Sequence, residues 1–231
     1  MHRETDPTGA HPSASSPPAG AALVPGQPGL LAAVVPAEGD DLHDVLDELG
    51  AVLAFLLGAG LPLPAAAAAA ARALTLPPLP SQPSAAALRL WAAAPEGPPL
   101  RVEARADRSP ASERPAWGRV DLIDEGEGWG LVRLVIAPGA TLPHHLHREM
   151  DEWERVLTAG LAGWRGEGPT LPLARGAAQR WPRGLAHGYQ NPSAAPQALL
   201  CLNRPAFLPA DEIVVPRAIF GDHWPEPTGG A

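Results

Sequence analysis

The sequence contains no lysine, and this absence excludes several kinds of catalytic chemistry. All 17 basic residues are arginine, and they face 25 acidic residues, which gives a formal net charge of -8. A Schiff-base site, a P-loop and a kinase-type site each need a lysine amine, and arginine does not lose its proton to replace it. Because the chain is acidic and has no basic stripe, we expect no nucleic-acid partner.

Cysteine and long apolar runs are also scarce. Cys201 is the single cysteine, so the chain can form neither an internal disulfide nor a cysteine-based zinc site. Residues 50–71 carry no charge, but they contain Pro62 and Pro64 and end in alanines, which is weakly apolar for a membrane span. The first residues lack the basic start and apolar core of a signal peptide. We therefore expect a cytoplasmic protein with no membrane partner.

Proline and glycine are abundant instead, and their uneven placement suggests three regions. Residues 1–36 are rich in Pro, Ser, Gly and Ala without a sustained period, which predicts a disordered tail. Residues 37–108 predict a small helical or α+β region. It contains a helix that starts after Asp40 or Asp41 and ends at Gly58, a second helix over residues 64–74, and a hairpin with strands at 88–91 and 100–104.

Residues 109–231 show a different sequence pattern. Short runs alternate between apolar and polar residues, for example at 130–136, 154–157 and 198–202, and each is closed by Gly or Pro. Such evenly spaced strands favour an all-β sandwich, jelly roll or barrel. The fold class is thus mainly β, preceded by the small helical or α+β segment and the tail.

The histidines suggest a metal site. On a strand, His145 and His147 project to one face and His144 to the other, and Glu152 follows beyond a hairpin turn. Two imidazoles and a carboxylate on one face form a metal site with open positions, and an imidazole from a distant strand would complete it. These ligand types suit Fe²⁺, Mn²⁺, Ni²⁺ or Zn²⁺.

Two motifs in this region resemble the signatures of the cupin superfamily. They read Gly139-x5-His145-x-His147-x4-Glu152 and Gly176-x5-Pro182-x-Gly184-x2-His187-x3-Asn191. The first departs from the family pattern after Glu152, where seven residues instead of six precede the closing glycine, and a bulge or another closing point would absorb the extra residue. The resemblance covers about residues 117–216.

The resemblance implies a double-stranded β-helix, a small jelly-roll barrel that holds one metal ion. The family's ligands correspond to His145, His147, Glu152 and His187, whereas His144 has no counterpart. We expect one divalent cation, Fe²⁺ in the first place, with Mn²⁺, Ni²⁺ and Zn²⁺ as alternatives. Asn191 is expected to hold the turn after the strand that carries His187.

Glu154 and Tyr189 are the candidate catalytic residues. Glu154 shares the face of Glu152 if the strand is regular, and there it would act as a general base. Alternatively, a bulge rotates Glu154 outward, or Arg133 or Arg155 neutralises it. Tyr189 shares the face of His187, and it either donates a hydrogen bond to a bound anion or lies at the barrel rim.

Three functions are consistent with these observations. The first is a metal-dependent enzyme that acts on a small polar metabolite by oxygenation, isomerisation or lyase chemistry. The second is a non-catalytic module that binds a sugar-like or anionic ligand. The third is a pterin-related protein, and it rests on a weak resemblance of residues 40–91 to dihydroneopterin aldolase-type chains. The glutamate and lysine that such enzymes use are missing here. This half of the chain would therefore be a decayed, non-catalytic region. We also expect a homodimer formed through sheet edges, unless the helix at residues 42–57 covers its own barrel.

Overall fold

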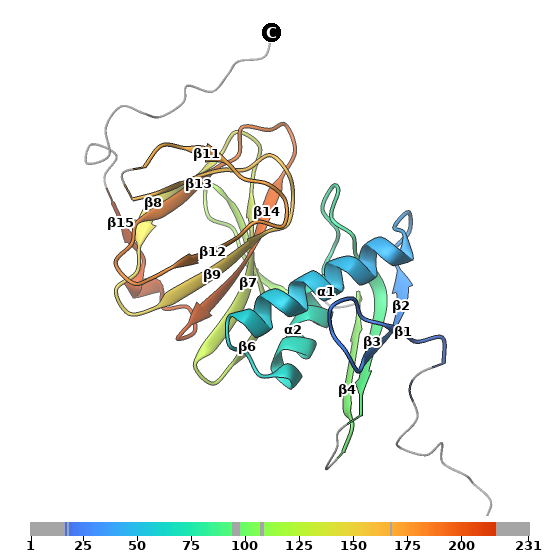
Figure 1. Ribbon diagram of the computed structural model, residues 1–231. Helices are drawn as coiled ribbons and strands as arrows, with labels where there is room; N and C mark the ends of the chain where they lie inside the picture. Colours follow the sequence, from blue (N-terminus) through green and yellow to red (C-terminus); the bar gives the residue numbers. More distant parts are fainter. Residues whose placement is uncertain (1–16, 18, 94–97, 107–108, 167, 216–231) are drawn as a thin grey trace, which may run out of the picture.

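The computed structural model describes residues 17, 19–93, 98–106, 109–166 and 168–215. The N-terminal unit consists of β1 (Ala22–Leu23), β2 (Leu30–Pro36), α1 (Leu42–Gly58), α2 (Leu63–Leu74), β3 (Ala85–Ala92) and β4 (Leu100–Arg105). The barrel consists of β5 (Ala111–Glu113), β6 (Gly118–Gly126), β7 (Trp129–Ile136), β8 (Thr141–Leu146), β9 (Asp151–Val156), β10 (Ala162–Arg165), β11 (Leu171–Pro172), β12 (Ala178–Trp181), β13 (His187–Gln190), β14 (Gln197–Arg204), a short 3₁₀ helix (Pro209–Asp211) and β15 (Ile213–Val214). Figure 1 shows the two units side by side.

The helices of the N-terminal unit begin and end where the sequence predicts. The carboxylate of Asp41 caps α1 by accepting a hydrogen bond of 2.7 Å from the amide of His43, and α1 ends at Gly58. The apolar stripe from Val45 to Leu56 is buried. The alanine-rich α2 ends at Leu74, before the prolines at 77 and 78. Neither helix has the length and apolarity needed to cross a bilayer.

The N-terminal sheet corrects the predicted extent of the tail. Its antiparallel strands follow the order β1-β2-β3-β4, with both helices inserted between β2 and β3, and β3 and β4 form the predicted hairpin. Strand β2 lies within the segment predicted as a disordered tail. It nevertheless pairs with β3 along its length and buries Leu30 and Ala32. That part of the tail prediction is wrong, because the sheet supplies the hydrogen bonds and the helices supply the apolar surface that this segment lacks alone. The first sixteen residues of the predicted tail lie outside the described residues.

The barrel is built from two antiparallel sheets, as the resemblance implied. A six-stranded sheet has the order β12-β9-β14-β7-β6-β5, and a five-stranded sheet has the order β11-β10-β13-β8-β15. Side chains from both sheets, among them Ile136, Leu142, Val156 and Leu199, form an apolar cluster in the interior. The predicted strands at 130–136, 154–157 and 198–202 correspond to β7, β9 and β14.

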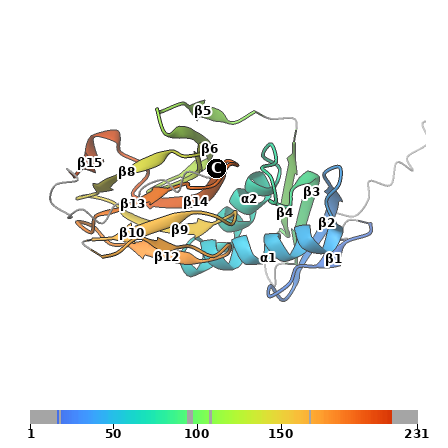
Figure 2. The ribbon, with the colours of Figure 1, turned by 90° about the horizontal axis from the view of Figure 1, so that it is seen from above.

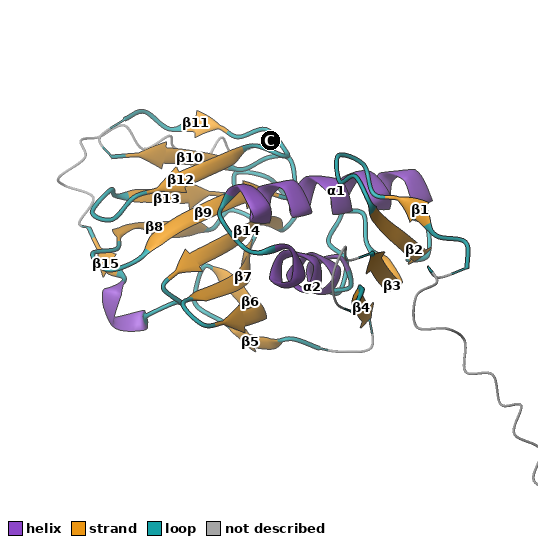
Figure 3. Cartoon of the chain, turned by 60° about the horizontal axis from the view of Figure 1, so that its bottom comes forward, coloured by secondary structure: helices purple, strands orange, loops and turns teal. Residues whose placement is uncertain are grey.

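The outer face of the six-stranded sheet is covered by the chain's own N-terminal unit. Leu131, Val135 and Leu200 on this face belong to the same hydrophobic cluster as the buried residues of α1 and α2. In Figures 1 and 3, α1 extends from the N-terminal sheet to the barrel, and the view from above in Figure 2 shows the same arrangement. A buried carboxylate on α1, Glu48, accepts a 2.9 Å hydrogen bond from Arg175 of the barrel. The helix predicted at residues 42–57 therefore covers its own barrel.

Candidate metal centre

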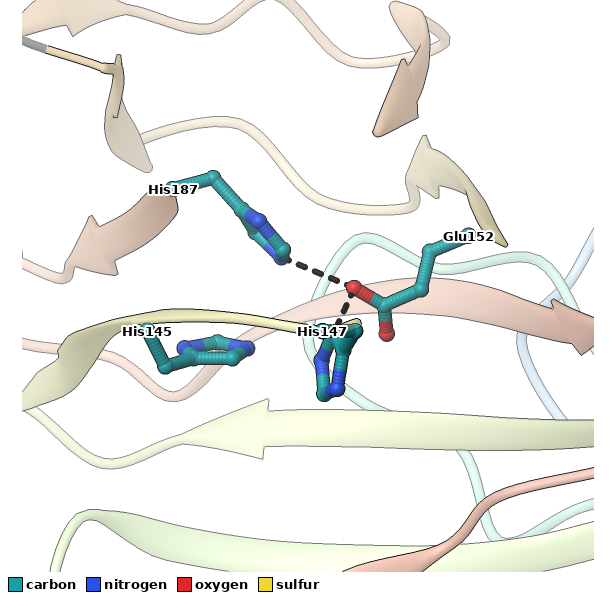
Figure 4. A group of neighbouring side chains, drawn as sticks. All are labelled: His145, His147, Glu152 and His187. Atoms are coloured by element: carbon teal, nitrogen blue, oxygen red, sulfur yellow. Dashed lines mark ion pairs between the residues drawn. The ribbon is translucent and has the colours of Figure 1, made fainter. Parts of the chain in front are cut away.

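The four predicted metal-ligating residues meet inside the barrel (Figure 4). His145 lies on β8, His147 directly follows this strand, Glu152 lies on β9, and His187 begins β13. Strand β13 pairs with β8 so that His187 lies opposite His145, which brings the distant imidazole to the hairpin that carries the other three residues. One ligand atom from each residue lies within 4.8 Å of the others, and all four side chains are buried. The spacing in the sequence therefore brings together the residues that it predicted.

The inner atoms of His147, Glu152 and His187 have no hydrogen-bond partner among the described residues. Glu152 Oε2 lies 2.9 Å from His187 Nε2 and 3.2 Å from His147 Nε2, but the geometry makes neither contact a hydrogen bond. Leaving buried polar atoms unsatisfied costs free energy, so such a group calls for a partner. Three imidazoles and one carboxylate that converge in this way fit a divalent first-row cation, because it accepts a lone pair from each of them.

Three of the four residues are held by a further group on their outer side. His145 Nδ1 lies 2.8 Å from the carbonyl oxygen of Pro143, and His187 Nδ1 lies 3.2 Å from that of Leu185. Both contacts leave Nε2 facing the centre, as in histidines that bind metals. The thiol of Cys201 lies 3.2 Å from Glu152 Oε1 and 3.0 Å from Asn203 Oδ1, so its single proton serves one of these two acceptors at a time. Oε2 of Glu152 faces the imidazoles. Sequence reasoning missed this role of Cys201, because β14 is distant from Glu152 in the chain.

The electrostatics of His145 and Glu152 favour the forms that bind a cation, whereas those of His187 favour its protonated form. Burial alone would lower the pKa of His187, but the contact with Glu152 raises it above the usual value, so a cation would displace a proton there. Burial, assisted by the nearby His187, lowers the pKa of His145 to about 3 and keeps this imidazole neutral. Burial alone would raise the pKa of Glu152, but contacts with His147 and His187 hold it well below its usual range. A neutral imidazole and an ionised carboxylate are the forms that act as metal ligands.

Glu154 also points into the barrel. Strand β9 pairs without irregularity with both β12 and β14, so the extra residue of the first motif falls in the turn at 157–160 and not in a bulge. Arg133 pairs with Asp121, and Arg155 contacts Glu48. The two alternatives, that Glu154 is rotated outward or neutralised by an arginine, are therefore wrong.

Glu154 belongs to a hydrogen-bonded group beside the metal centre. Its Oε2 accepts hydrogen bonds from the Tyr189 hydroxyl and from Trp181 Nε1, and all three side chains are buried. Tyr189 is therefore not a rim residue. Burial is the main cause that raises the pKa of Glu154, to about 7. The ring of Trp181 stacks on His187 with 4.6 Å between centroids, so this group also packs against a metal-ligating residue.

Two further residues lie where the sequence predicts. His144 faces away from the cluster, and its ring lies 5.8 Å from that of Trp164. Asn191 holds the turn after β13, because its side-chain amide donates to the carbonyl oxygens of Ile136 and Ala195 at 2.9 and 2.8 Å.

A cavity of about 450 Å³ opens onto the cluster. His145, His147 and Glu152 lie on its wall, together with Cys201 and Asn203. Its apolar lining includes Trp117, Val132, Leu134, Leu142 and Phe207, and its carboxylates besides Glu152 are Glu113, Glu125 and Glu212. Among the described residues, the lining contains no arginine, and it does not include Glu154 or Tyr189. The cavity thus offers a ligand apolar walls, several carboxylates and the face of the metal cluster.

Several known proteins are similar to the chain. The Xanthan biosynthesis protein XanB of Xanthomonas campestris is 32% identical over 98 residues, which are 42% of this chain and 21% of that protein. A putative mannose-1-phosphate guanylyltransferase of Vibrio cholerae is 30% identical over 118 residues, which are 50% of this chain and 25% of that protein. The chain therefore spans about a fifth to a quarter of the length of these curated relatives. A crystal structure of a protein from Planctomyces limnophilus is 22% identical, with a TM-score of 0.38, over 45% of this chain and 88% of that one.

The family comparison concerns the barrel itself. Residues 132–203 match the family model of the cupin domain, and this range contains all four residues of the metal cluster. None of the matches shows the resemblance of the N-terminal unit to dihydroneopterin aldolase-type chains. The two motifs, the two facing sheets and this match all point to the same family. The C-terminal part of the chain, with residues 132–203 at its centre, is therefore a cupin domain, a member of the cupin superfamily.

Proposed function

We propose that the protein is a metal-dependent cupin enzyme that acts on a small polar metabolite. One observation carries the proposal: unsatisfied buried atoms of His147, Glu152 and His187 converge beside a cavity large enough for a small molecule. His145, His147, Glu152 and His187 would hold one divalent cation, Fe²⁺ in the first place. When bound, the cation would act as a Lewis acid that polarises oxygen atoms of the substrate.

The lining of the cavity supports a neutral or amine-bearing substrate. Trp117 and Phe207 offer flat apolar surface, while Glu113, Glu125 and Glu212 offer only negative charge or hydrogen-bond acceptors at neutral pH. A phosphate or carboxylate group at the outer end of the substrate would have no arginine to pair with among the described lining residues. Partial desolvation raises the pKa of Glu212 above its usual value, although its side chain is exposed.

Glu154 and Tyr189 stay candidates for proton transfer, with a restricted geometry. They lie within the barrel next to His187 and outside the described lining of the cavity. From there Glu154 can exchange a proton with Tyr189, to which it is hydrogen-bonded, but a substrate would have to reach past the metal-ligating side chains to touch it. The proposed reaction is an oxygenation, an isomerisation or a lyase reaction, and the identity of the substrate decides among the three.

The second candidate function is a non-catalytic module that binds a ligand at the same cation. This function is favoured by the positions of Glu154 and Tyr189, the two candidate catalytic residues. Neither belongs to the described lining of the cavity, so neither would touch a ligand bound there. The names of the relatives, which refer to xanthan and to mannose 1-phosphate, favour a sugar-like ligand for such a module.

The test measures bound metal first and turnover second. We expect the purified protein to hold one divalent ion, and His187→Ala and Glu152→Ala to lower metal content at least tenfold, because each removes a ligand. His144→Ala is the matched control, since it removes a buried imidazole of the same hairpin on the opposite face. Retention of metal by His187→Ala together with its loss in His144→Ala would refute the ligand assignment. Metal-loaded protein that binds a neutral or amine-bearing compound from a metabolite panel, yet neither consumes oxygen nor changes the compound, would support the binding module instead.

A further inference from the structure

The loop that joins the two ligand-bearing strands is held by a carboxylate from far along the chain. Asp211 Oδ1 accepts hydrogen bonds from the amides of Arg148 and Glu149 at 2.8 and 3.1 Å, and Oδ2 accepts from those of Glu149 and Met150 at 3.0 and 3.1 Å. Three consecutive amides that point at one anion form a strong anion-binding arrangement. This loop begins at His147 and leads to Glu152, so its conformation sets how these two residues face each other.

The same carboxylate also faces one of the metal-ligating residues. Asp211 Oδ2 lies 3.9 Å from His147 Nδ1, while Nε2 on the other side of the ring lies 3.2 Å from Glu152 Oε2. A negative charge beside Nδ1 favours the tautomer that carries its proton there and leaves the lone pair of Nε2 toward the centre. Among the described residues, His147 Nδ1 has no hydrogen-bond partner, unlike Nδ1 of His145 and of His187. Asp211 lies on that side of the ring at 3.9 Å, which is too long for a hydrogen bond, so it acts on His147 through its charge.

Asp211 reaches the loop because the following segment pairs with the ligand strand. Val214 on β15 lies opposite His145 on β8, and the amide of Val215 donates to the carbonyl oxygen of His144 at 2.8 Å. Asp211 is buried, at 7% exposure, although it lies in a surface segment. It also lies outside residues 132–203, which match the cupin family. The contact therefore belongs to this chain's own C-terminal segment.

We propose that Asp211 is a positioning residue for the metal centre: it fixes the loop between His147 and Glu152 through three amides and orients the His147 ring from its outer side. The proposal rests on the metal binding proposed above. Asp211 itself is no metal ligand, since the loop amides occupy both of its oxygens.

The test compares Asp211→Asn with the wild type. The amide keeps the shape and one acceptor, but it turns an NH₂ donor toward the loop amides and removes the charge beside His147. We expect Zn²⁺, measured by competition with a chromophoric chelator, to bind about 10- to 100-fold more weakly. We also expect the visible absorption bands of the Co²⁺-loaded variant to shift, which a loss of stability alone would not produce. Circular dichroism well below the melting temperature identifies folded variants, and Asp211→Glu, which keeps the charge, should recover part of the affinity.

Asp40→Asn is the matched control, because Asp40 Oδ2 likewise accepts hydrogen bonds from the amide and hydroxyl of Ser84, at 3.0 and 2.9 Å, in the N-terminal unit. It should lower stability without changing the affinity for Zn²⁺. The proposal is overturned if folded Asp211→Asn binds Zn²⁺ within twofold of the wild type, or if Asp40→Asn weakens binding equally.

A second measurement separates this proposal from the proposed function. In metal-free protein, hydrogen exchange at the amides of residues 148–150 should be at least tenfold faster in Asp211→Asn. If the wild type binds no Zn²⁺ or Co²⁺, the proposed function fails, whereas faster exchange still supports the loop contact. Unchanged exchange in the variant would overturn the role of Asp211 itself.

Discussion

The buried ion pair between Asp121 and Arg133 predicts a large loss of stability when one partner is removed. Each side chain is only 1% exposed, and Arg133 donates to Asp121 Oδ2 through Nε at 3.0 Å and Nη2 at 2.8 Å. Ser112 donates to the other oxygen, and Arg133 also donates to the carbonyl oxygen of Pro77, which follows α2. The pair therefore joins β6 and β7 of the barrel to the N-terminal unit.

Asp121→Asn leaves the guanidinium of Arg133 buried without its counter-charge. Breaking a buried ion pair in this way costs about 3 to 5 kcal/mol of unfolding free energy. The exposed pair between Arg89 and Glu103, with side chains 55% and 61% exposed, provides the control. Glu103→Gln should cost about 0 to 1 kcal/mol, because water already solvates both charges.

Urea unfolding at neutral pH, followed by tryptophan fluorescence, measures both variants. Replacing the pair together, as Asp121→Leu with Arg133→Met, should cost less than Asp121→Asn, because the buried guanidinium of Arg133 is removed with its partner. Arg119 also loses Asp121, which it contacts at 2.8 Å, but its side chain is 27% exposed and water can solvate its charge. The reasoning is refuted if Asp121→Asn costs no more than Glu103→Gln.

The pH dependence supplies an independent check of the same pair. Burial alone would raise the pKa of Asp121, but hydrogen bonds from Ser112 and Arg133 lower it below the usual value. The corresponding stability is present above the unfolded-state pKa of about 3.9 and is lost as the pH falls through the lower folded-state value. The wild type should lose this part of its stability in acid, and Asp121→Asn should not.

Three further predictions concern Glu154, β2 and assembly. Since burial raises the pKa of Glu154 to about 7, metal-free protein should lose stability as the pH rises from about 4.5 to about 7, and this contribution should level off above that pH. Thermal melting of Glu154→Gln should show a flatter profile in this range. A chain that starts at Ala37 lacks the buried residues of Leu30–Pro36 and should melt far below one that starts at Pro17; equal melting temperatures would show that β2 is dispensable. Helices α1 and α2 cover a face of the six-stranded sheet, which still ends at the edge strands β12 and β5, so a homodimer through a sheet edge stays a prediction. Light scattering should give twice the chain mass of 24.0 kDa, and a monomer would refute the homodimer and favour α1 as the cover that replaces it.

Local sequence patterns predicted much of the fold. The leucine spacing and the aspartate cap predicted α1, and the prolines after Leu74 predicted where α2 ends. The period of a strand predicted that His145 and His147 share a face and that His144 does not, and the two motifs supplied Glu152 and His187. These predictions succeed because each depends on backbone geometry over a few residues or on spacing that the family shares.

Strand β2 shows where local reasoning fails. Leu30–Pro36 is a continuous apolar run between Gly29 and Gly39, which is consistent with a buried strand, but its proline-rich surroundings favoured disorder. Its stability comes from pairing with β3, whose partner residues lie 49 to 62 positions away, and from the helices that cover it. The direction of Glu154 was open for a related reason, since the sequence could place the extra residue of the first motif in a bulge or in the turn.

The sequence by itself predicted the four residues of the candidate metal cluster. Local spacing indicated His145, His147 and Glu152, and the motif shared with the cupin family indicated His187. Only the tertiary structure decided what surrounds that set: Cys201 beside Glu152, Tyr189 and Trp181 on Glu154, and Asp211 on the loop between the ligand strands. These contacts join residues 27 to 63 positions apart, and hydrogen bonds over such separations depend on how the sheets pack and not on any local pattern. For the same reason, the cover that α1 and α2 provide for the barrel follows from the three-dimensional fit of two apolar surfaces, each of which the sequence shows separately.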